Sequence, residues 1–252
     1  MSNIFKGRIF VCADLHGSSA RIQEIINQID NPTENDVIII AGDAGFEYGN
    51  RVMGAAKKYS KKFPGYWVVL RGNHDDCYWK NHPDWLTLQG ENGANFLYQK
   101  KYPKILYIFD GGGIYKIGNY NFLMIPGAYS VDKKYRLAKH YPYNVNEQLT
   151  YKEKYELEEL VIAWNDYDFP IDYVIAHTFP LYLEHTIKDL YLDFINQNDV
   201  DKSTEQWLDQ MAGIYECNKD FKHYYGGHFH SDRDLNDKYT MVYRNVIQIG
   251  EK

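Results

Sequence analysis

The 252-residue sequence has few cysteines and no excess of positive charge. The first argues against a disulfide-stabilised protein and the second against a nucleic-acid-binding protein. The three cysteines, Cys12, Cys77 and Cys217, are odd in number and far apart, so a disulfide framework is not expected and a reducing compartment is the default. The net charge of −6 and the isoelectric point near 5.8 lack the basic excess that binding to a phosphate backbone needs. Nucleic acid is therefore not expected as a partner.

Long apolar runs are absent as well. No run approaches the ~18 consecutive apolar residues of a transmembrane helix, and the start, MSNIFKGRIFVCAD, lacks the apolar core of a signal peptide. We therefore expect a cytoplasmic protein without a membrane partner. The sequence has no repeat, linker or low-complexity segment, and its length suits one large core, so residues 1–252 are predicted to form a single domain. Its oligomeric state is left open.

The N-terminal third alternates between apolar runs and amphipathic stretches. The apolar runs RIFVCAD, DVIIIAGD and GYWVVLRGNHD predict strands at 8–14, 36–43 and 65–75, with helices between them at 18–29 and 50–63. Such alternation indicates a parallel sheet with right-handed crossovers. In sheets of this kind, sites form at the carboxyl ends of the strands.

From about residue 95 the pattern changes to short strands separated by glycine, asparagine or lysine turns, which is typical of an antiparallel meander. An amphipathic helix is then predicted over 151–164, a buried strand over 171–177 and a helical, loop-like region over 178–222. The chain closes with strands around KHYYGGHFH and TMVYRNVIQIG. Two sheets with outer helices are the simplest arrangement of these elements.

Aspartate, histidine and asparagine gather where five of the predicted strands end, next to glycines that permit sharp turns and close approach. On an extended segment, residues two apart point to the same face, so each Asp-x-His or His-x-His pair is expected to face one site. Each residue alone could cap a helix, fill a turn or be a buried structural histidine. Five strand ends together indicate one shared site. The residues are Asp14, His16, Asp43, Asn73, His74, Asp75, His177, His228 and His230.

Seven of these side chains are candidate metal ligands, more than one four-coordinate zinc site would use. Two metal ions about 3.5 to 4 Å apart, sharing one carboxylate, would use all seven. Two carboxylates against two divalent cations leave residual positive charge, which favours an anionic substrate such as a phosphate ester. Imidazole, carboxylate and amide without thiolate suit Mn, Fe, Zn or Ni better than Ca or Mg. The seven are Asp14, His16, Asp43, Asn73, His177, His228 and His230.

The motifs DLH, GD, GNHD, H and GHFH, in this order over residues 14–230, closely resemble those of the calcineurin-like metallophosphoesterase family, in particular its small bacterial and phage-type members. The resemblance implies an α/β (α+β) fold, a four-layer αββα sandwich in which two facing mixed β-sheets are flanked by helices. It also implies a metal-dependent phosphoesterase that cleaves phosphomonoesters or phosphodiesters by attack of a metal-bridging hydroxide. A phosphorylated small molecule or a nucleotide would be the substrate.

The resemblance also assigns roles by motif position, with two divalent metal ions per chain as cofactors. His74 would bind no metal but would lie beside the substrate and stabilise or protonate the leaving oxygen. Asp43 would bridge the two ions. Asp14, His16 and His230 would bind the first ion, and Asn73, His177 and His228 the second.

One departure bears on the subclass. The GDxVDRG element of Ser/Thr protein phosphatases is replaced here by GDAGFEY, so Phe46 stands where those enzymes have an acidic residue that orients the catalytic histidine. Asp75 or Glu47 could take that role, or no residue takes it. A classical protein phosphatase is therefore less expected than a small phosphoesterase. That alternative, a nuclease of the same family and a catalytically silent metal-binding scaffold stay open.

The stretch PGAYSVDKKYR is similar to a segment of uncharacterised bacterial and phage members. It offers Tyr129, Asp132 and Arg136 as substrate contacts, since arginine suits bidentate binding of phosphate. A solvated helix start would explain the same residues equally well.

Overall fold

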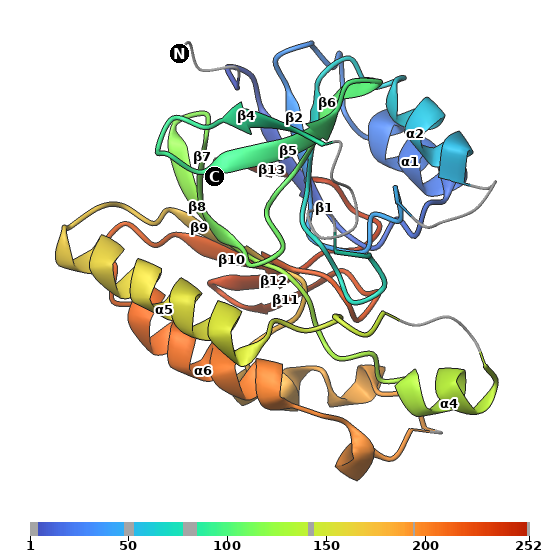
Figure 1. Cartoon of the computed structure of the whole chain (residues 1–252), viewed down its shortest axis with the longest axis vertical. Helices are drawn as coiled ribbons and strands as arrows, with labels where there is room; N and C mark the ends of the chain where they lie inside the picture. Colours follow the sequence, from blue (N-terminus) through green and yellow to red (C-terminus); the bar gives the residue numbers. More distant parts are fainter. Residues whose placement is uncertain (1–4, 48–52, 78–84, 141–143, 194, 251–252) are drawn as a thin grey trace.

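The computed structural model describes residues 5–47, 53–77, 85–140, 144–193 and 195–250. Two β-sheets face each other between two outer layers of helices (Figure 1). The predicted four-layer sandwich with two mixed sheets is therefore confirmed.

The first sheet has the strand order β13-β1-β2-β3-β6-β5-β4 in the described part of the chain. Its central strands β1, β2, β3 and β6 run parallel, as the strand–helix alternation predicts, while β13, β5 and β4 are antiparallel to their neighbours. The strands are β1 (Ile9–Cys12), β2 (Val37–Ile40), β3 (Tyr66–Val69), β4 (Leu86–Gln89), β5 (Asn95–Gln99), β6 (Tyr102–Tyr107) and β13 (Ile247–Ile249).

The second sheet has the order β11-β12-β10-β9-β8-β7 over the same described ranges. Strands β8, β9, β10 and β12 run parallel, with β7 and β11 antiparallel at the two edges. The strands are β7 (Gly113–Ile117), β8 (Tyr120–Ile125), β9 (Tyr173–Ala176), β10 (His223–Gly226), β11 (Arg233–Asn236) and β12 (Tyr239–Met241).

The prediction of a single antiparallel meander after residue 95 was wrong. Strands β5 and β6 complete the first sheet, whereas the β7–β8 hairpin begins the second. β6 also pairs in parallel with β3, and β8 in parallel with β9. The turn residues between these strands are local signals, but the choice of partner depends on strands far away in the sequence.

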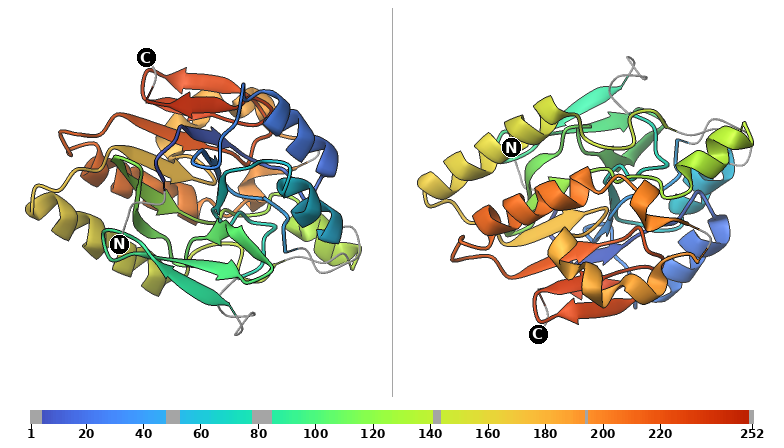
Figure 2. Two further views of the ribbon diagram at one scale, coloured as in Figure 1. Left: turned by 90° about the horizontal axis from the view of Figure 1, so that it is seen from above. Right: turned by 90° about the horizontal axis from the view of Figure 1, so that it is seen from below.

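Helices α1 (Ser19–Asn27) and α2 (Met53–Ser60) cover the outer face of the first sheet, and α5 (Tyr151–Asp166) and α6 (Ser203–Tyr215) cover that of the second (Figure 2). The three N-terminal residues of the helix predicted at 50–63 lie outside the described residues. A capping box starts α5, because Thr150 and Glu153 each accept a backbone N–H of the other. Among the described residues, no helix combines the length and the apolar character needed to cross a bilayer.

Strand β1 shows how one short run serves two apolar layers. Its odd residues Ile9 and Val11 lie in the core between the two sheets, while Phe10 and Cys12 pack in the core beneath α1. Side chains alternate between the faces of a strand, so a run without polar residues predicts burial on both sides. The packed strand therefore gives a rigid support to Asp14, two residues beyond its end.

The carboxyl ends of strands from both sheets meet at one edge of the sandwich. The N–H of Asp14, after β1, donates to the carbonyl of Gly42, after β2, at 3.1 Å, and the N–H of Gly227, after β10, donates to the carbonyl of His177, after β9, at 3.1 Å. The two sheets are joined there by the N–H of His228, which donates to Asp14 Oδ2 at 3.0 Å. The strand-end residues thus come together at this edge.

Candidate metal centre

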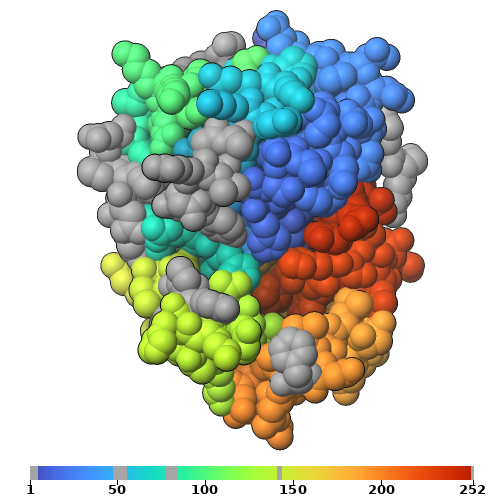
Figure 3. Space-filling view, turned by 90° about the vertical axis from the view of Figure 1, so that its right-hand side faces the viewer, coloured from blue at the N-terminus to red at the C-terminus, as the bar shows by residue number. Residues whose placement is uncertain are grey.

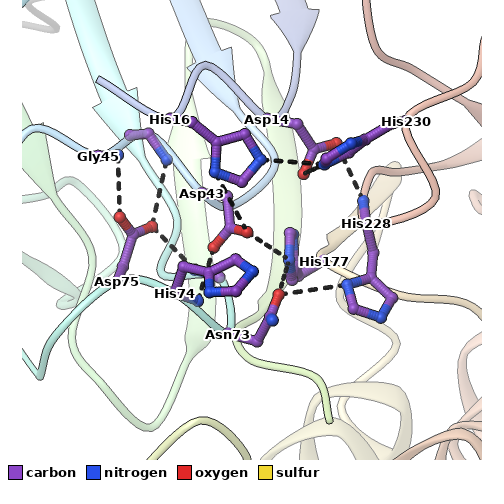
Figure 4. Close-up of polar contacts among 12 residues, drawn as sticks. Asp14, His16, Asp43, Gly45, Asn73, His74, Asp75, His177, His228 and His230 are labelled. Carbon is purple, nitrogen blue, oxygen red and sulfur yellow. Dashed lines mark hydrogen bonds and ion pairs between the residues drawn. The ribbon is translucent and has the colours of Figure 1, made fainter. Parts of the chain in front are cut away.

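All the strand-end residues singled out from the sequence lie within one region of the molecule, drawn in Figure 4. The loops after β1, β2 and β3 supply six of them, and those after β9 and β10 supply the other three. They are Asp14, His16, Asp43, Asn73, His74, Asp75, His177, His228 and His230.

Five of these residues have a left-handed backbone, which non-glycine residues rarely adopt. The chain therefore turns sharply straight after each strand, and the expectation that the two His-containing pairs lie on extended segments was wrong, although both pairs do face the site. Each such residue costs of order 1–3 kcal/mol, which the surrounding fold must offset. Their φ angles are 54° at Asp14, 46° at His16, 52° at Asp43, 75° at His228 and 51° at His230.

Two of the glycines are required by close approach. A Cβ on Gly42, whose φ is +92°, would lie 2.0 Å from His177 Nδ1. A Cβ on Gly227 would lie 2.6 Å from the Cβ of Ala13. Glycine at both positions lets the loops of the two sheets touch.

A first group of possible ligands is formed by Asp14, His16 and His230, whose ligand atoms all lie within 4.8 Å of one another. His16 Nε2 is 2.9 Å from His230 Nε2, and His230 Nε2 is 3.7 Å from Asp14 Oδ1. That Asp14 oxygen is buried and has no hydrogen-bond partner among the described residues. The His230 ring stacks on Tyr243, with centroids 5.0 Å apart and planes 9° apart, a support that the sequence did not reveal.

A second group surrounds the fully buried His177. Its Nδ1–H donates to the carbonyl of Ala41 at 3.0 Å, which directs Nε2 towards Asn73 Oδ1, 2.8 Å away, and Asp43 Oδ2, 3.5 Å away. His228 Nδ1 lies 3.2 Å from the same Asn73 oxygen. Ring nitrogens and side-chain oxygens thus converge on one point.

Asn73 is oriented by a residue that sequence reasoning missed. Its Nδ2 donates to Ser130 Oγ at 2.8 Å, so its Oδ1 points to the histidines. Ser130 lies in the stretch PGAYSVDKKYR, which was singled out, but nothing in that pattern distinguishes this serine from a turn residue.

Asp43 lies between the two groups. Its Oδ1 accepts the backbone N–H of His74 at 2.9 Å. Its Oδ2 is 3.9 Å from His16 Nδ1 and 3.5 Å from His177 Nε2. One carboxylate is therefore within reach of both groups.

Without a cation, protons offset the negative charge of the site. Burial raises the pKa of Asp14 to about 8. Burial alone would raise the pKa of Asp43 too, but the charge of His177 and its hydrogen bond hold it well below the ordinary value. Burial would lower the pKa of His177, yet Asp43 outweighs it and raises that pKa to about 9. In the absence of a metal ion, the positive charge of protonated His177 thus offsets the negative charge of Asp43, a role that a metal cation could take over.

The other three imidazoles of the two groups are held neutral. Burial lowers the pKa of His16 to about 4 and that of His228 well below its ordinary value, and it also lowers the pKa of His230. Neutral imidazole and ionised carboxylate are the forms that bind metal ions. The unpartnered Asp14 oxygen, the facing imidazole nitrogens and the absence of thiolate together fit divalent metal ions.

Asp75 does not contact the His74 ring in the described structure. Its buried carboxylate accepts the backbone N–H of Gly72 at 3.0 Å, of Gly45 at 2.9 Å and of Ala44 at 3.2 Å. It therefore ties the loop after β3 to the loop after β2.

Glu47, the other candidate for orienting His74, is used elsewhere. It accepts the Tyr107 hydroxyl at 2.6 Å and pairs with Lys57. Phe46 is buried against Trp67, with ring centroids 6.0 Å apart, so the position where protein phosphatases have an acidic residue belongs here to the core.

His74 faces a cavity of about 280 Å³ that also contains Asp43 and Asn73. Two segments, residues 129–139 and 179–202, line the opposite wall, and we call them the cap; residue 194 lies outside the described residues. Figure 3 shows this side of the molecule, where helix α4 (Lys133–Ala138) and the segment after β9 come together below α1. The cap residues that line the cavity are Val131, Asp132, Leu190, Tyr191, Leu192, Ile195 and Gln197.

The three predicted substrate contacts are placed differently. Asp132 lines the cavity together with His74. Arg136 pairs with Asp132 Oδ2 at 2.7 Å and is not among the residues that line the cavity. Burial chiefly lowers the pKa of His74, and the charge of Arg136 adds to this while that of Asp132 opposes it. Tyr129 lines a smaller pocket beside the cavity.

Comparisons with known proteins gave a family match and a similar solved structure. No curated protein matches the sequence. Among solved structures, phosphopantetheinyl hydrolase from Mycobacterium tuberculosis is similar, with 14% identity, a TM-score of 0.48, and coverage of 98% of this chain and 97% of that one. The family model described as calcineurin-like phosphoesterase matches residues 7–232. The sequence motifs, the two-sheet sandwich and this match over most of the chain lead to one conclusion: the protein belongs to the calcineurin-like phosphoesterase family.

Proposed function

We propose that the protein is a phosphoester hydrolase that works with two divalent metal ions. The observation that carries the proposal is a pair of adjoining ligand groups, Asp14 with His16 and His230 and Asp14 with Asp43 and His177, around a buried Asp14 oxygen that accepts no hydrogen bond in the described structure. Membership of the calcineurin-like phosphoesterase family supports the same chemistry.

The residues divide between the two ions according to which side of Asp43 they occupy. Asp43 would be shared, and Mn, Fe, Zn or Ni would suit these ligands. Bound ions of this kind lower the pKa of water towards neutrality and offset the charge of the phosphate. Asp14, His16 and His230 would hold one ion, and Asn73, His177 and His228 the other.

His74 is proposed to act on the leaving oxygen. Its backbone N–H is fixed on Asp43, and its ring lines the cavity 5.6 Å from the ring of His16, measured between centroids. A ring N–H held there can donate a hydrogen bond or a proton to an oxygen that leaves phosphorus. Asp75 acts indirectly, because it fixes the backbone from which His74 projects.

The substrate is proposed to be a phosphorylated small molecule or a nucleotide. The cavity of about 280 Å³ is close to the lower end of the usual size range of ligand pockets, roughly 300–1,000 Å³, and its cap wall is largely apolar. Asp132 would contact the substrate directly, with Arg136 paired behind it and Tyr129 in the adjoining pocket.

A reconstitution experiment tests the proposal. The full chain is loaded with Mn, Fe, Zn or Ni, its metal content is measured, and hydrolysis of p-nitrophenyl phosphate, bis-p-nitrophenyl phosphate and nucleotides is followed. We expect about two ions per chain and hydrolysis of at least one ester. Asp43→Asn should lose metal and more than about 10³-fold in turnover, beyond the usual cost of one oxyanion donor.

Asp36→Asn is the matched control, because Asp36 is equally buried but is bonded to Arg8 away from the site. It should keep its metal and its activity per folded molecule. Metal binding without hydrolysis of any ester would contradict the enzyme and indicate a metal-binding scaffold instead.

A further inference from the structure

A narrow side pocket adjoins the cavity over the metal centre. Its volume is about 30 Å³, enough for little more than the end of an unbranched chain. The two hollows share lining residues, so a molecule with its phosphate at the metal centre can extend from one into the other. The shared residues are Val131, Tyr191, Gln197, His228 and Phe229.

Aromatic rings make up part of the wall that the side pocket shares with the cavity. Phe229 stands between His228 and His230, and its ring packs against Phe179, with centroids 6.3 Å apart, and Tyr191, with centroids 6.5 Å apart. These rings make this part of the wall better suited to contact with methylene groups than with charged ones.

The wall of the side pocket includes an acceptor that receives no hydrogen bond in the described part of the chain. Glu205, on α6, accepts the Thr178 hydroxyl through Oε1 at 3.1 Å, but its buried Oε2 has no hydrogen-bond partner in the described part of the chain. The other acid in the pocket, Glu184, is satisfied by Lys202 and by the Tyr191 hydroxyl. Buried polar groups in proteins are usually paired, so the Glu205 oxygen calls for a donor from a ligand.

We propose that this side pocket binds the leaving group of the substrate, and that the substrate is a phosphoester of an unbranched alcohol whose far end carries a hydroxyl or amine that donates to Glu205 Oε2. The inference rests on the proposed hydrolase function and specifies its substrate class. The aromatic wall at Phe229 would favour an alkyl chain in the leaving group, and Glu205 would favour a hydrogen-bond donor at the end of that alkyl chain.

The electrostatics of Glu205 are consistent with this role. Burial raises its pKa to about 7. A donor from the substrate would offset that burial, because a hydrogen bond to the carboxylate favours the ionised form.

The test is a series of phosphomonoesters of unbranched alcohols with two to eight carbons, each ending in a methyl, a hydroxyl or an amine. The full chain, loaded with Mn, is assayed by phosphate release. At one chain length we expect kcat/KM for the hydroxyl or amine ester to exceed that of the methyl ester by about tenfold, the size of one good hydrogen bond. Equal values at every length would overturn the proposal.

Glu205→Gln and Glu205→Met should abolish the preference for a donor while leaving hydrolysis of methyl-ended esters within about twofold of the parent, since the metal centre is untouched. Asp209→Asn is the matched control: it neutralises a carboxylate on the same helix that lines neither hollow, and it should keep the preference. A preference that survives both Glu205 variants would overturn the proposal.

The two proposals fail separately. If all esters are hydrolysed at equal rates, the proposal for the side pocket is contradicted while the proposal of a hydrolase still holds. If no ester is hydrolysed, the binding of the same phosphates to the full chain is measured by calorimetry, which tests the side pocket independently of hydrolysis. Tighter binding of donor-ended phosphates to the parent but not to Glu205→Gln would support it, and equal binding would overturn it.

Discussion

The two walls of the cavity are built in opposite ways. On the metal side, Asp14, Asp43, Asn73 and His177 are buried in loops that follow parallel strands, whereas His230 is exposed, and backbone hydrogen bonds join those loops within and between the sheets. On the cap side, Phe179, Leu183 and Ile187 are buried, but α4 and the 3-10 helices η2 (Lys188–Leu190) and η3 (Gln197–Asp199) have no buried residue, and Leu137 and Leu192 are 48% and 46% exposed. We therefore propose that the metal side carries the chemistry and that the exposed parts of the cap influence which substrate binds.

The largest effect is expected at His74, on the metal side. His74→Ala should lower turnover by about 10²- to 10⁴-fold, the usual loss for an acid–base group, while the metal content stays near that of the parent. Single-turnover kinetics and metal analysis on the same sample would check both. Unchanged turnover would show that the leaving oxygen needs no help from this residue.

The next largest effect is expected at Asp75, which supports the metal side without touching the site. Asp75→Asn replaces one acceptor by an amide that faces backbone N–H groups, so it should weaken metal affinity by about 10- to 100-fold, as loss of a supporting group does. Competition with a chelator measures this. Asp76→Asn, one residue along, is the control and should bind metal like the parent.

The side pocket, which adjoins both walls, can be probed through the pH dependence of stability at Glu205. Its pKa is about 7 in the folded protein and 4.5 ordinarily, so between these values the folded chain holds a proton that the unfolded chain has lost. Its contribution to the free energy of unfolding is therefore complete below pH 4.5, and up to about 3 kcal/mol of it is lost as the pH rises to 7.

Urea titrations of the parent and of Glu205→Gln at pH 5 and pH 8 would check this. The stability of the parent relative to the variant should fall between the two values. A constant difference would place the carboxyl in a wetter environment than the structure shows.

The smallest effect is expected on the cap. Leu192→Ala should raise KM by about threefold with kcat unchanged, because a half-exposed leucine contributes uniform binding only. Leu137→Ala removes an equally exposed leucine that does not line the cavity, and KM should not change. A drop in kcat for Leu192→Ala would give the cap a part in the chemistry.

The metal side was easier to predict from the sequence than the cap. The strand-end motifs predicted the set of residues that comes together at the site, because parallel strands deliver their carboxyl ends to one edge. Local patterns did not predict the left-handed backbone at His16 or His228, which long-range packing imposes. Nor did they reveal Ser130, whose contact with Asn73 spans 57 residues.

The cap was the least predictable region. Its segments are short and without clear periodicity, so the sequence indicated only helical and loop-like structure over 178–222. Edge strands β4 and β11 were also missed, because one is mostly exposed and the other carries charged residues at its start. Polar edge strands resemble loops in sequence, since only one side of them is paired.

The contact between Asp14 and the backbone of His228 joins residues 214 positions apart. On a chain that emerges from the ribosome from its N-terminus, the ligands after β1, β2 and β3 are present long before β10 exists. The metal centre can therefore be completed only once the last part of the chain is made and placed. A chain truncated before β10 would lack His228 and His230, and we expect it to bind metal more weakly than the full chain.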